Sequence, residues 1–178
     1  MYQQVINFWF EEVKKSQWFK KDEDFDHRIA LLFSETHSRA IQGELFSWRE
    51  THLGMLAEII VLDQFSRNML RGQPESFAYD SLALILAQTA IAGRHDLLLD
   101  VEQRRFLYMP FMHSESLIIH QQALKLYTDL GVNDALVFEQ RHKTIIEKFG
   151  RYPHRNEVLG RESTDAEIAF LAHPGSRF

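Results

Sequence analysis

The chain has 178 residues, 45% of them hydrophobic and 25% charged, and this composition fits one ordinary globular domain spanning residues 1–178. It has no cysteine, which excludes disulfides, thiolate metal ligands and cysteine nucleophiles and suits a reducing, cytoplasmic environment. The net charge of −5 argues against nucleic acid as a partner, and no apolar run is long enough to span a bilayer, so we expect a cytoplasmic protein that does not use a membrane.

Amphipathic periodicity predicts about seven or eight helices and no strand. Asp22 is the expected N-cap of the second helix, Pro110 the expected end of the fifth, Ser114 the expected cap of the sixth, and Thr164 with Glu167 has the pattern of a reciprocal capping box. Because the connections are short, antiparallel neighbours are favoured, and the expected fold is a single all-α domain of stacked helical hairpins. The helices are expected at about residues 2–15, 23–40, 51–70, 81–92, 101–109, 114–130, 134–149 and 165–173.

The third expected helix changes from apolar to polar along one face. At 100° per residue, its apolar stripe continues into Gln64, Arg67, Asn68 and Arg71. Asp63 stands four residues before Arg67 and could pair with it along the helix. The face is either part of a pocket for a polar or anionic ligand or an internal hydrogen-bond network that joins helices.

The segment after Pro110 is a second candidate. His113 and Glu115 lie where we expect one helix to end and the next to begin, so they are our candidate proton carriers. The alternative is that these groups only satisfy the start of the sixth helix.

The seventh expected helix and the turn after it are basic. Six Lys/Arg against two Glu between Arg141 and Arg161 give a local charge of +4. Such a patch could hold a phosphate or carboxylate, because arginine binds both in a bidentate manner. Alternatives are a nucleic-acid stripe, which has few aromatics here, and pairing with the acidic segment 22–26. The ligand-binding candidates in this region are Arg141, Arg151, His154, Arg155 and Asn156.

Metal and cofactor sites are not expected. Glu139 and His142 have one Glu-x-x-His spacing, but the second copy that a di-iron bundle needs is missing. His113 and His120 are about two helical turns apart, too far to share one ion along a helix. Nucleotide-loop, dinucleotide, zinc-protease and nucleophile-elbow motifs are absent from the sequence.

Several long motifs resemble a bacterial family, the domain-of-unknown-function family nine hundred and twenty-four. They are NFWF at 7–10 with WFKK at 18–21, LDQFSRN at 62–68, FLYMPFMHSE at 106–115 and FGRYPHRN at 149–156, and the likeness runs nearly end to end. The resemblance implies an all-helical fold similar to tetratricopeptide-repeat superhelices, although the repeat's own signature is missing, and it implies no activity. Ser66 stands where many relatives have proline, and Tyr152 where phenylalanine is common.

Two functional hypotheses and a structural one follow. In the first, the candidate residues line one pocket that binds or acts on a small anionic ligand. In the second, the protein is a helical interaction module for a protein or peptide partner. In the third, the polar motifs are a buried network that holds the helices together.

Overall fold

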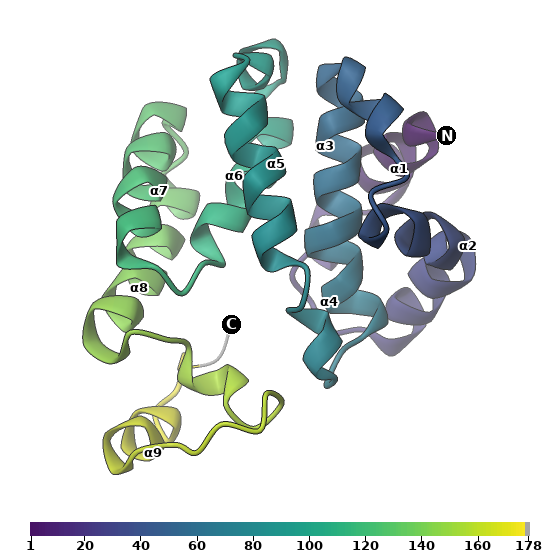
Figure 1. Ribbon diagram of the computed structural model, residues 1–178. Helices are drawn as coiled ribbons and strands as arrows, with labels where there is room; N and C mark the ends of the chain where they lie inside the picture. Colours follow the sequence, from purple (N-terminus) through teal and green to yellow (C-terminus); the bar gives the residue numbers. More distant parts are fainter. Residues whose placement is uncertain (177–178) are drawn as a thin grey trace. The chain divides into compact units, whose positions relative to one another are not determined.

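The computed structural model of the protein describes residues 1–176. This part of the chain is all-α, as predicted, and residues 1–176 contain no strand (Figure 1). The α-helices are α1 (Tyr2–Asn7), α2 (Glu23–Ile41), α3 (His52–Ile60), α4 (Ser66–Met69), α5 (Asp80–Ala92), α6 (Val101–Met112), α7 (Leu117–Leu130), α8 (Asn133–Phe149) and α9 (Asp165–Leu171).

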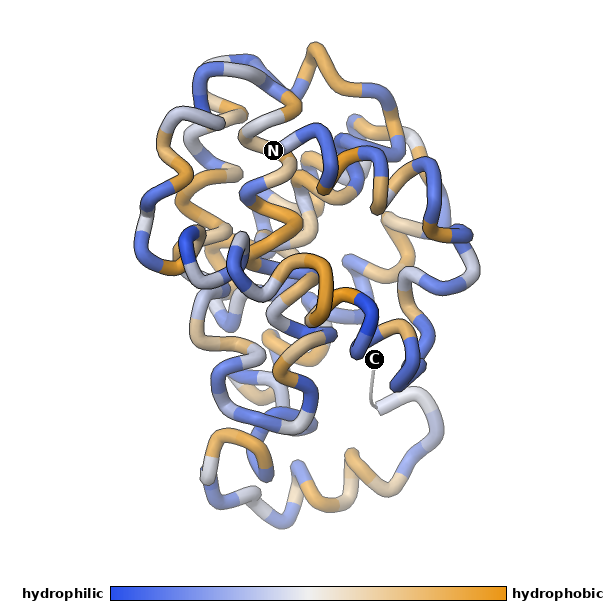
Figure 2. Tube along the Cα trace, turned by 90° about the vertical axis from the view of Figure 1, so that its right-hand side faces the viewer, coloured by the Kyte–Doolittle hydropathy of each residue, from blue (hydrophilic) through white to orange (hydrophobic). Residues whose placement is uncertain are grey.

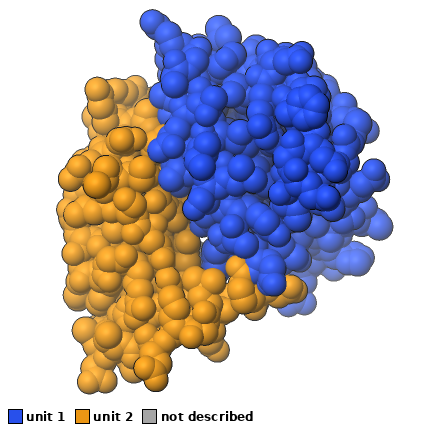
Figure 3. Space-filling model, viewed as in Figure 1, with its two compact units in different colours: residues 1–71, 75–110 blue, residues 72–74, 111–178 orange. Residues whose placement is uncertain are grey.

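The chain divides into two compact units, which Figure 3 colours separately. Unit 1 comprises Met1–Arg71 and Glu75–Pro110, and unit 2 comprises Gly72–Pro74 and the residues from Phe111 onward. The single domain expected for residues 1–178 stays a prediction. Within both units, hydrophilic and hydrophobic stretches alternate along the helices, as amphipathic helices require (Figure 2).

Two predicted helix starts are confirmed at the level of atoms. The Asp22 carboxylate accepts a hydrogen bond of 3.1 Å from the Phe25 amide and caps α2. Thr164 and Glu167 form the reciprocal capping box of α9, with distances of 2.8 and 3.3 Å.

The prediction that Pro110 ends a helix is wrong, because α6 continues through it to Met112. A proline so close to the helix end removes one backbone hydrogen bond, and the burial of Phe111 and Met112 offsets that loss. Ser114 is also not the cap of the next helix. Its hydroxyl accepts from the Ser116 amide at 3.2 Å and closes a short turn, so α7 begins three residues later than expected.

The first helical run is shorter than predicted, because it ends at Glu12 through a π-helical turn over Phe8–Glu12. Val13 then takes an extended conformation and is buried. The third predicted helix is one helical run made of α3, a π-helical turn over Val61–Phe65, and α4. Extra residues in a π turn re-aim the side chains that follow it, and here those are the polar ones.

The core of unit 1 is aromatic. Its centre is Trp9, which contacts the rings of Trp18, Phe25, Phe65 and Phe106 at centroid distances of 5.6–6.4 Å. Around this cluster α1 and α5 pack against α3, and α2 packs against α4. The third helical run is therefore covered from several sides, which explains why it is apolar nearly all round.

Unit 2 is built on the helical hairpin of α7 and α8 (Figure 1). Gly131 joins the two helices with φ of 74°, a left-handed conformation that glycine adopts without strain. After α8, Tyr152 packs back on Ile145 and Ile146 of this helix, and Phe149 and Phe170 border the cluster. In residues 1–176, no helix combines the length and the apolar character that crossing a membrane needs.

Candidate functional site

Arg67 in unit 1 binds two carboxylates. Its guanidinium lies 3.0 Å from Asp63 Oδ1, the helical pair expected from the sequence, and 2.9 Å from Asp80 Oδ1 at the start of α5. Asp63 is 1% exposed, so its charge depends on this partner. Arg67 thus joins the third helical run to α5.

The other three members of the predicted polar stripe also bind within unit 1. Gln64 donates to Asp63 at 2.6 Å and lies 3.3 Å from the sulfur of Met109. Asn68 donates to Asp26 on α2 at 2.7 Å. Arg71 donates to the same carboxylate, at 2.6 Å from its Nε. Asp26 belongs to the acidic segment that we considered as a partner for the basic turn, but here it binds the stripe instead.

His37 and Ser66 form a buried contact that the sequence did not reveal. His37 Nε2 lies 2.8 Å from Ser66 Oγ, and the same hydroxyl donates to the Leu62 carbonyl at 2.6 Å. Burial lowers the pKa of His37, so the neutral ring is favoured. A proline at position 66 has no hydroxyl and could not make this contact, so the contact depends on the serine that this chain has there.

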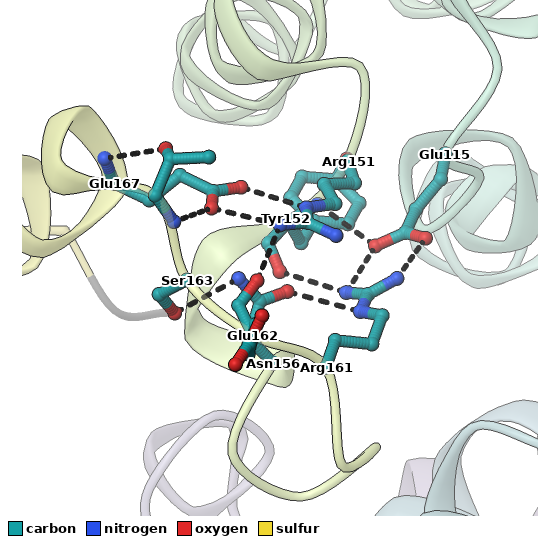
Figure 4. Close-up of polar contacts among 9 residues, drawn as sticks. Glu115, Arg151, Tyr152, Asn156, Arg161, Glu162, Ser163 and Glu167 are labelled. Atoms are coloured by element: carbon teal, nitrogen blue, oxygen red, sulfur yellow. Dashed lines mark hydrogen bonds and ion pairs between the residues drawn. The ribbon is translucent and has the colours of Figure 1, made fainter.

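In unit 2 Glu115 is an acceptor for arginine rather than a free acid. Its carboxylate accepts two hydrogen bonds from Arg161, at 2.7 and 3.0 Å, and one from the Tyr152 amide at 2.8 Å (Figure 4). Burial raises the pKa of Glu115, but the bonds from Arg161 and Tyr152 and the charges of Arg161 and Arg155 outweigh burial and hold the pKa below its ordinary value. A carboxylate held in this way is a poor proton carrier near neutral pH.

The turn after α8 is held by a second bidentate pair. Arg151 donates to both oxygens of Glu167, at 2.7 and 2.8 Å, and to the Glu162 carbonyl at 2.8 Å (Figure 4). Asn156 bridges the same loop, since its amide donates to Ser163 and its oxygen accepts from Arg161. The pairing lowers the pKa of Glu167 to about 2, mainly through the hydrogen bond from Arg151.

A buried histidine–glutamate pair was missed by the sequence reasoning. His120 on α7 and Glu139 on α8 are both 0% exposed, and His120 Nδ1 lies 2.8 Å from Glu139 Oε1. The other ring nitrogen, Nε2, lies 2.9 Å from the Ser114 carbonyl and 3.1 Å from the Tyr152 hydroxyl. That hydroxyl donates to the Met112 carbonyl at 2.5 Å, a bond that a phenylalanine could not make.

A sequence signal for this pair did exist. His120 shares the buried face of α7 with Ala123 and Tyr127, and Glu139 shares the buried face of α8 with Ala135 and Ile146. A polar residue on the apolar face of each of two adjacent helices indicates a buried polar pair.

Basic side chains gather around Tyr152. Its ring lies 5.6 Å from the ring of His142 and 5.5 Å from that of His154, and the Arg155 guanidinium lies 4.6 Å from its centre. Arg155 also donates to the His113 carbonyl at 3.0 Å. The pKa of His142 is lowered to about 3, mainly by burial; the hydrogen bond to the Phe138 carbonyl opposes this change, and the charges of His113, His120 and His154 add to it. We call His113, His142, His154 and Arg155 the basic cluster.

The structure therefore places the predicted site residues in two groups. Gln64, Arg67, Asn68 and Arg71 lie together in unit 1, and His113, Glu115, Arg151, His154, Arg155 and Asn156 lie together in unit 2. Arg141 stands apart on the exposed face of α8, with its guanidinium 5.8 Å from the Phe138 ring. A single pocket made of all these residues stays a prediction.

Metal ligation has no geometric basis in the part of the chain described. No group of three or more His, Asp or Glu side chains within residues 1–176 is arranged to hold an ion. Glu139 and His142 bind different partners: Glu139 pairs with His120, and His142 contacts the Phe138 carbonyl.

These features define an all-α protein of helical hairpins whose sequence motifs are densely paired polar groups. The chain belongs to the family described as bacterial protein of unknown function (DUF924), whose model matches residues 5–175 and confirms the resemblance noted in its motifs. It is similar to the solved structure of a protein of unknown function from Agrobacterium tumefaciens, with 37% identity, a TM-score of 0.91 and 96% of each chain covered. No curated protein matches the chain.

Proposed function

We propose that the protein binds a small anionic ligand at the basic cluster of unit 2. The observation that carries the proposal is that the rings of His142 and His154 and the guanidinium of Arg155 surround the Tyr152 ring, with His113 near enough to affect the charge of His142. The nearby carboxylates of Glu115 and Glu139 are directed at Arg161 and His120. A bound anion would be attracted by the permanent charge of Arg155, and also by His113 and His154 when these are protonated.

Of the predicted site residues, the ligand-binding candidates His154 and Arg155 and the proposed proton carrier His113 support this proposal best. His113 and His154 are half-buried, so a ligand can reach them, and Arg155 is buried beside them. Arg151 would contribute indirectly, because its bidentate pair with Glu167 holds the turn that carries His154 and Arg155. The proposal concerns binding, and Glu115 has no proton-transfer role in it.

The test is a thermal-shift titration with inorganic phosphate, pyrophosphate, sulfate and citrate at about pH 6 and about pH 8. We expect at least one anion to raise Tm, and to raise it more at the lower pH, because protonated imidazoles attract it more strongly. His154→Gln should remove most of the rise. Arg141→Ala is the matched control, since it deletes a basic side chain from the same unit outside the cluster, and it should leave the rise intact.

Two outcomes would overturn the proposal. One is that no anion shifts Tm at either pH. The other is that Arg141→Ala lowers the response as much as His154→Gln does, which would mark unspecific charge screening. If His154→Gln lowers the stability of the free protein, NMR titration of the histidine ring protons with phosphate gives a direct readout of binding in the unmodified chain.

The second candidate function is a helical interaction module whose polar motifs serve the fold. The bidentate pairs of Arg151 with Glu167 and of Arg161 with Glu115 favour this reading for those arginines, because an external anion would have to displace an internal carboxylate. The likeness to tetratricopeptide-repeat superhelices belongs with this candidate. If unit 2 binds a protein partner and added phosphate releases that partner, the anion and the protein would share one binding surface.

A further inference from the structure

Helix α5 in unit 1 carries an uncharged stripe on its outer face. After Asp80, no residue from Ser81 to Gly93 is charged, whereas the outer face of a surface helix normally carries charge. The inner face packs against α3 through small residues and Leu86. The outer stripe repeats at helical spacing and is exposed throughout, with Ile85 57% exposed at its middle; its members are Ser81, Ile85, Thr89 and Ala92.

The stripe can be covered by a partner that offers few hydrogen-bonding groups. The Thr89 hydroxyl already donates to the Ile85 carbonyl at 2.8 Å, so Thr89 can be covered without losing a hydrogen bond. Ser81 and Ala92 are small and permit a close approach of another helix at either side of Ile85. The stripe therefore has the composition of a helix–helix contact.

The apolar surface continues beyond the helix. The 3₁₀ turn His95–Leu98 contacts α5, and its residues Leu97 and Leu98 are 51% and 65% exposed. Val101 at the start of α6 is 46% exposed. A helix of this length spans about 20 Å, and a stable interface buries roughly 800 Å² on each partner. The stripe alone is too narrow to bury that area, so the interface must also include Leu97, Leu98 and Val101.

The two ends of the stripe carry opposite charge. Glu75 is exposed in the 3₁₀ turn Pro74–Ser76 that precedes α5, and Arg94 is exposed in the turn that follows it. In an antiparallel pair of α5 helices, the end of one copy that carries Arg94 faces the end of the other copy that carries Glu75. The helix dipoles are also aligned favourably in that arrangement.

We propose that this surface joins two copies of the chain as a two-fold symmetric dimer, with antiparallel α5 helices at its centre. A second copy suits the surface because an uncharged centre with one acidic and one basic end is complementary to itself. An acidic or basic peptide would be matched at one end and repelled at the other.

The first experiment measures mass by sedimentation equilibrium from micromolar concentrations up to about 0.1 mM. The unmodified chain should show twice the mass of one chain, and Ile85→Glu should show the mass of one chain. Leu31→Glu is the matched control, because Leu31 is 75% exposed on α2, and that variant should stay dimeric. Leu98→Glu repeats the test from a different segment in case Ile85→Glu impairs folding.

The second experiment tests the orientation. Arg94→Glu should weaken the dimer at least about tenfold by placing two acidic groups opposite each other, and adding Glu75→Arg should restore it. A chain that stays monomeric over the whole concentration range overturns the dimer, as does a dimer that survives both Ile85→Glu and Leu98→Glu. A dimer that Arg94→Glu does not weaken, or that Glu75→Arg does not restore, overturns the antiparallel arrangement.

Discussion

Replacing Glu139 tests how the buried pair with His120 holds its proton. The Ser114 carbonyl can only accept, so His120 Nε2 must carry a hydrogen, and one further proton is shared between Nδ1 and Glu139 Oε1. The second oxygen of Glu139, Oε2, is buried and makes no hydrogen bond. Burial raises the pKa of Glu139, although the hydrogen bond and charge of His120 and the charge of Lys143 oppose the rise. We infer a neutral pair, because an ionised carboxylate would leave a charged oxygen without a donor.

Glu139→Gln and Glu139→Ala should therefore differ sharply. A glutamine amide donates to Nδ1 and puts its oxygen where Oε2 lies, so Glu139→Gln should change the free energy of unfolding by less than about 1 kcal/mol at neutral pH. Glu139→Ala leaves a buried nitrogen unpaired, which costs about 1–3 kcal/mol. It also opens a cavity of roughly 50 Å³, which adds about 1 kcal/mol. The sum is about 3 kcal/mol, or a fall in Tm of about 6–12 °C for a chain of this size.

The assay is urea and thermal unfolding of the three proteins between about pH 5 and pH 8. Because the folded pKa of Glu139 is raised, its proton stabilises the native state fully below the unfolded pKa, and this contribution falls as pH rises toward the folded pKa. Glu139→Gln removes that dependence, so its stability relative to the unmodified chain should improve with rising pH. If Glu139→Gln costs as much as Glu139→Ala, the negative charge itself stabilises the fold and the reasoning is refuted.

Two further predictions concern ion pairs. Arg67→Ala should lower the free energy of unfolding by about 3 kcal/mol, because it leaves the buried carboxylate of Asp63 without its arginine; a loss below about 1 kcal/mol in urea unfolding would show that this pair does not hold the helices. The pKa of Glu167 is lowered to about 2 by Arg151, so its stabilising contribution is present above the unfolded pKa and disappears as pH falls from about 4.5 toward 2. Arg151→Ala should flatten this acid limb of the stability curve, and an unchanged limb would contradict the pairing.

The helices could be predicted well from the sequence because their apolar periodicity is local information. The predicted ranges for α5 and α8 differ from the structure by one residue at their starts. The start of α7 was harder, since Ser114 and Ser116 both precede it and either could be its N-cap; the structure has Ser116 there, without a side-chain cap hydrogen bond. Pro110 was misjudged because its effect depends on the burial of the residues that follow it.

The candidate site was predictable only where partners are close in sequence. Asp63 and Arg67 are four residues apart on one helix, so their contact could be foreseen. Arg71 and Asp26 are 45 residues apart, and Arg161 and Glu115 are 46 apart, so these contacts depend on how the helices pack. The same limit hid the His120–Glu139 pair, although each residue stood out on the apolar face of its helix.

The position of the carboxylates decides what a basic motif in this fold can do. Arg151 and Arg161 come from one short loop, and both bind a glutamate from a different segment of unit 2. Their charges are therefore used to hold the turn that contains Tyr152. Two members of the basic cluster, His154 and Arg155, lie on that turn, and the turn keeps them beside the Tyr152 ring. The structural interpretation therefore accounts for the paired arginines, which fix the loop, whereas the proposed anion binding concerns other residues of the same motif, His154 and Arg155.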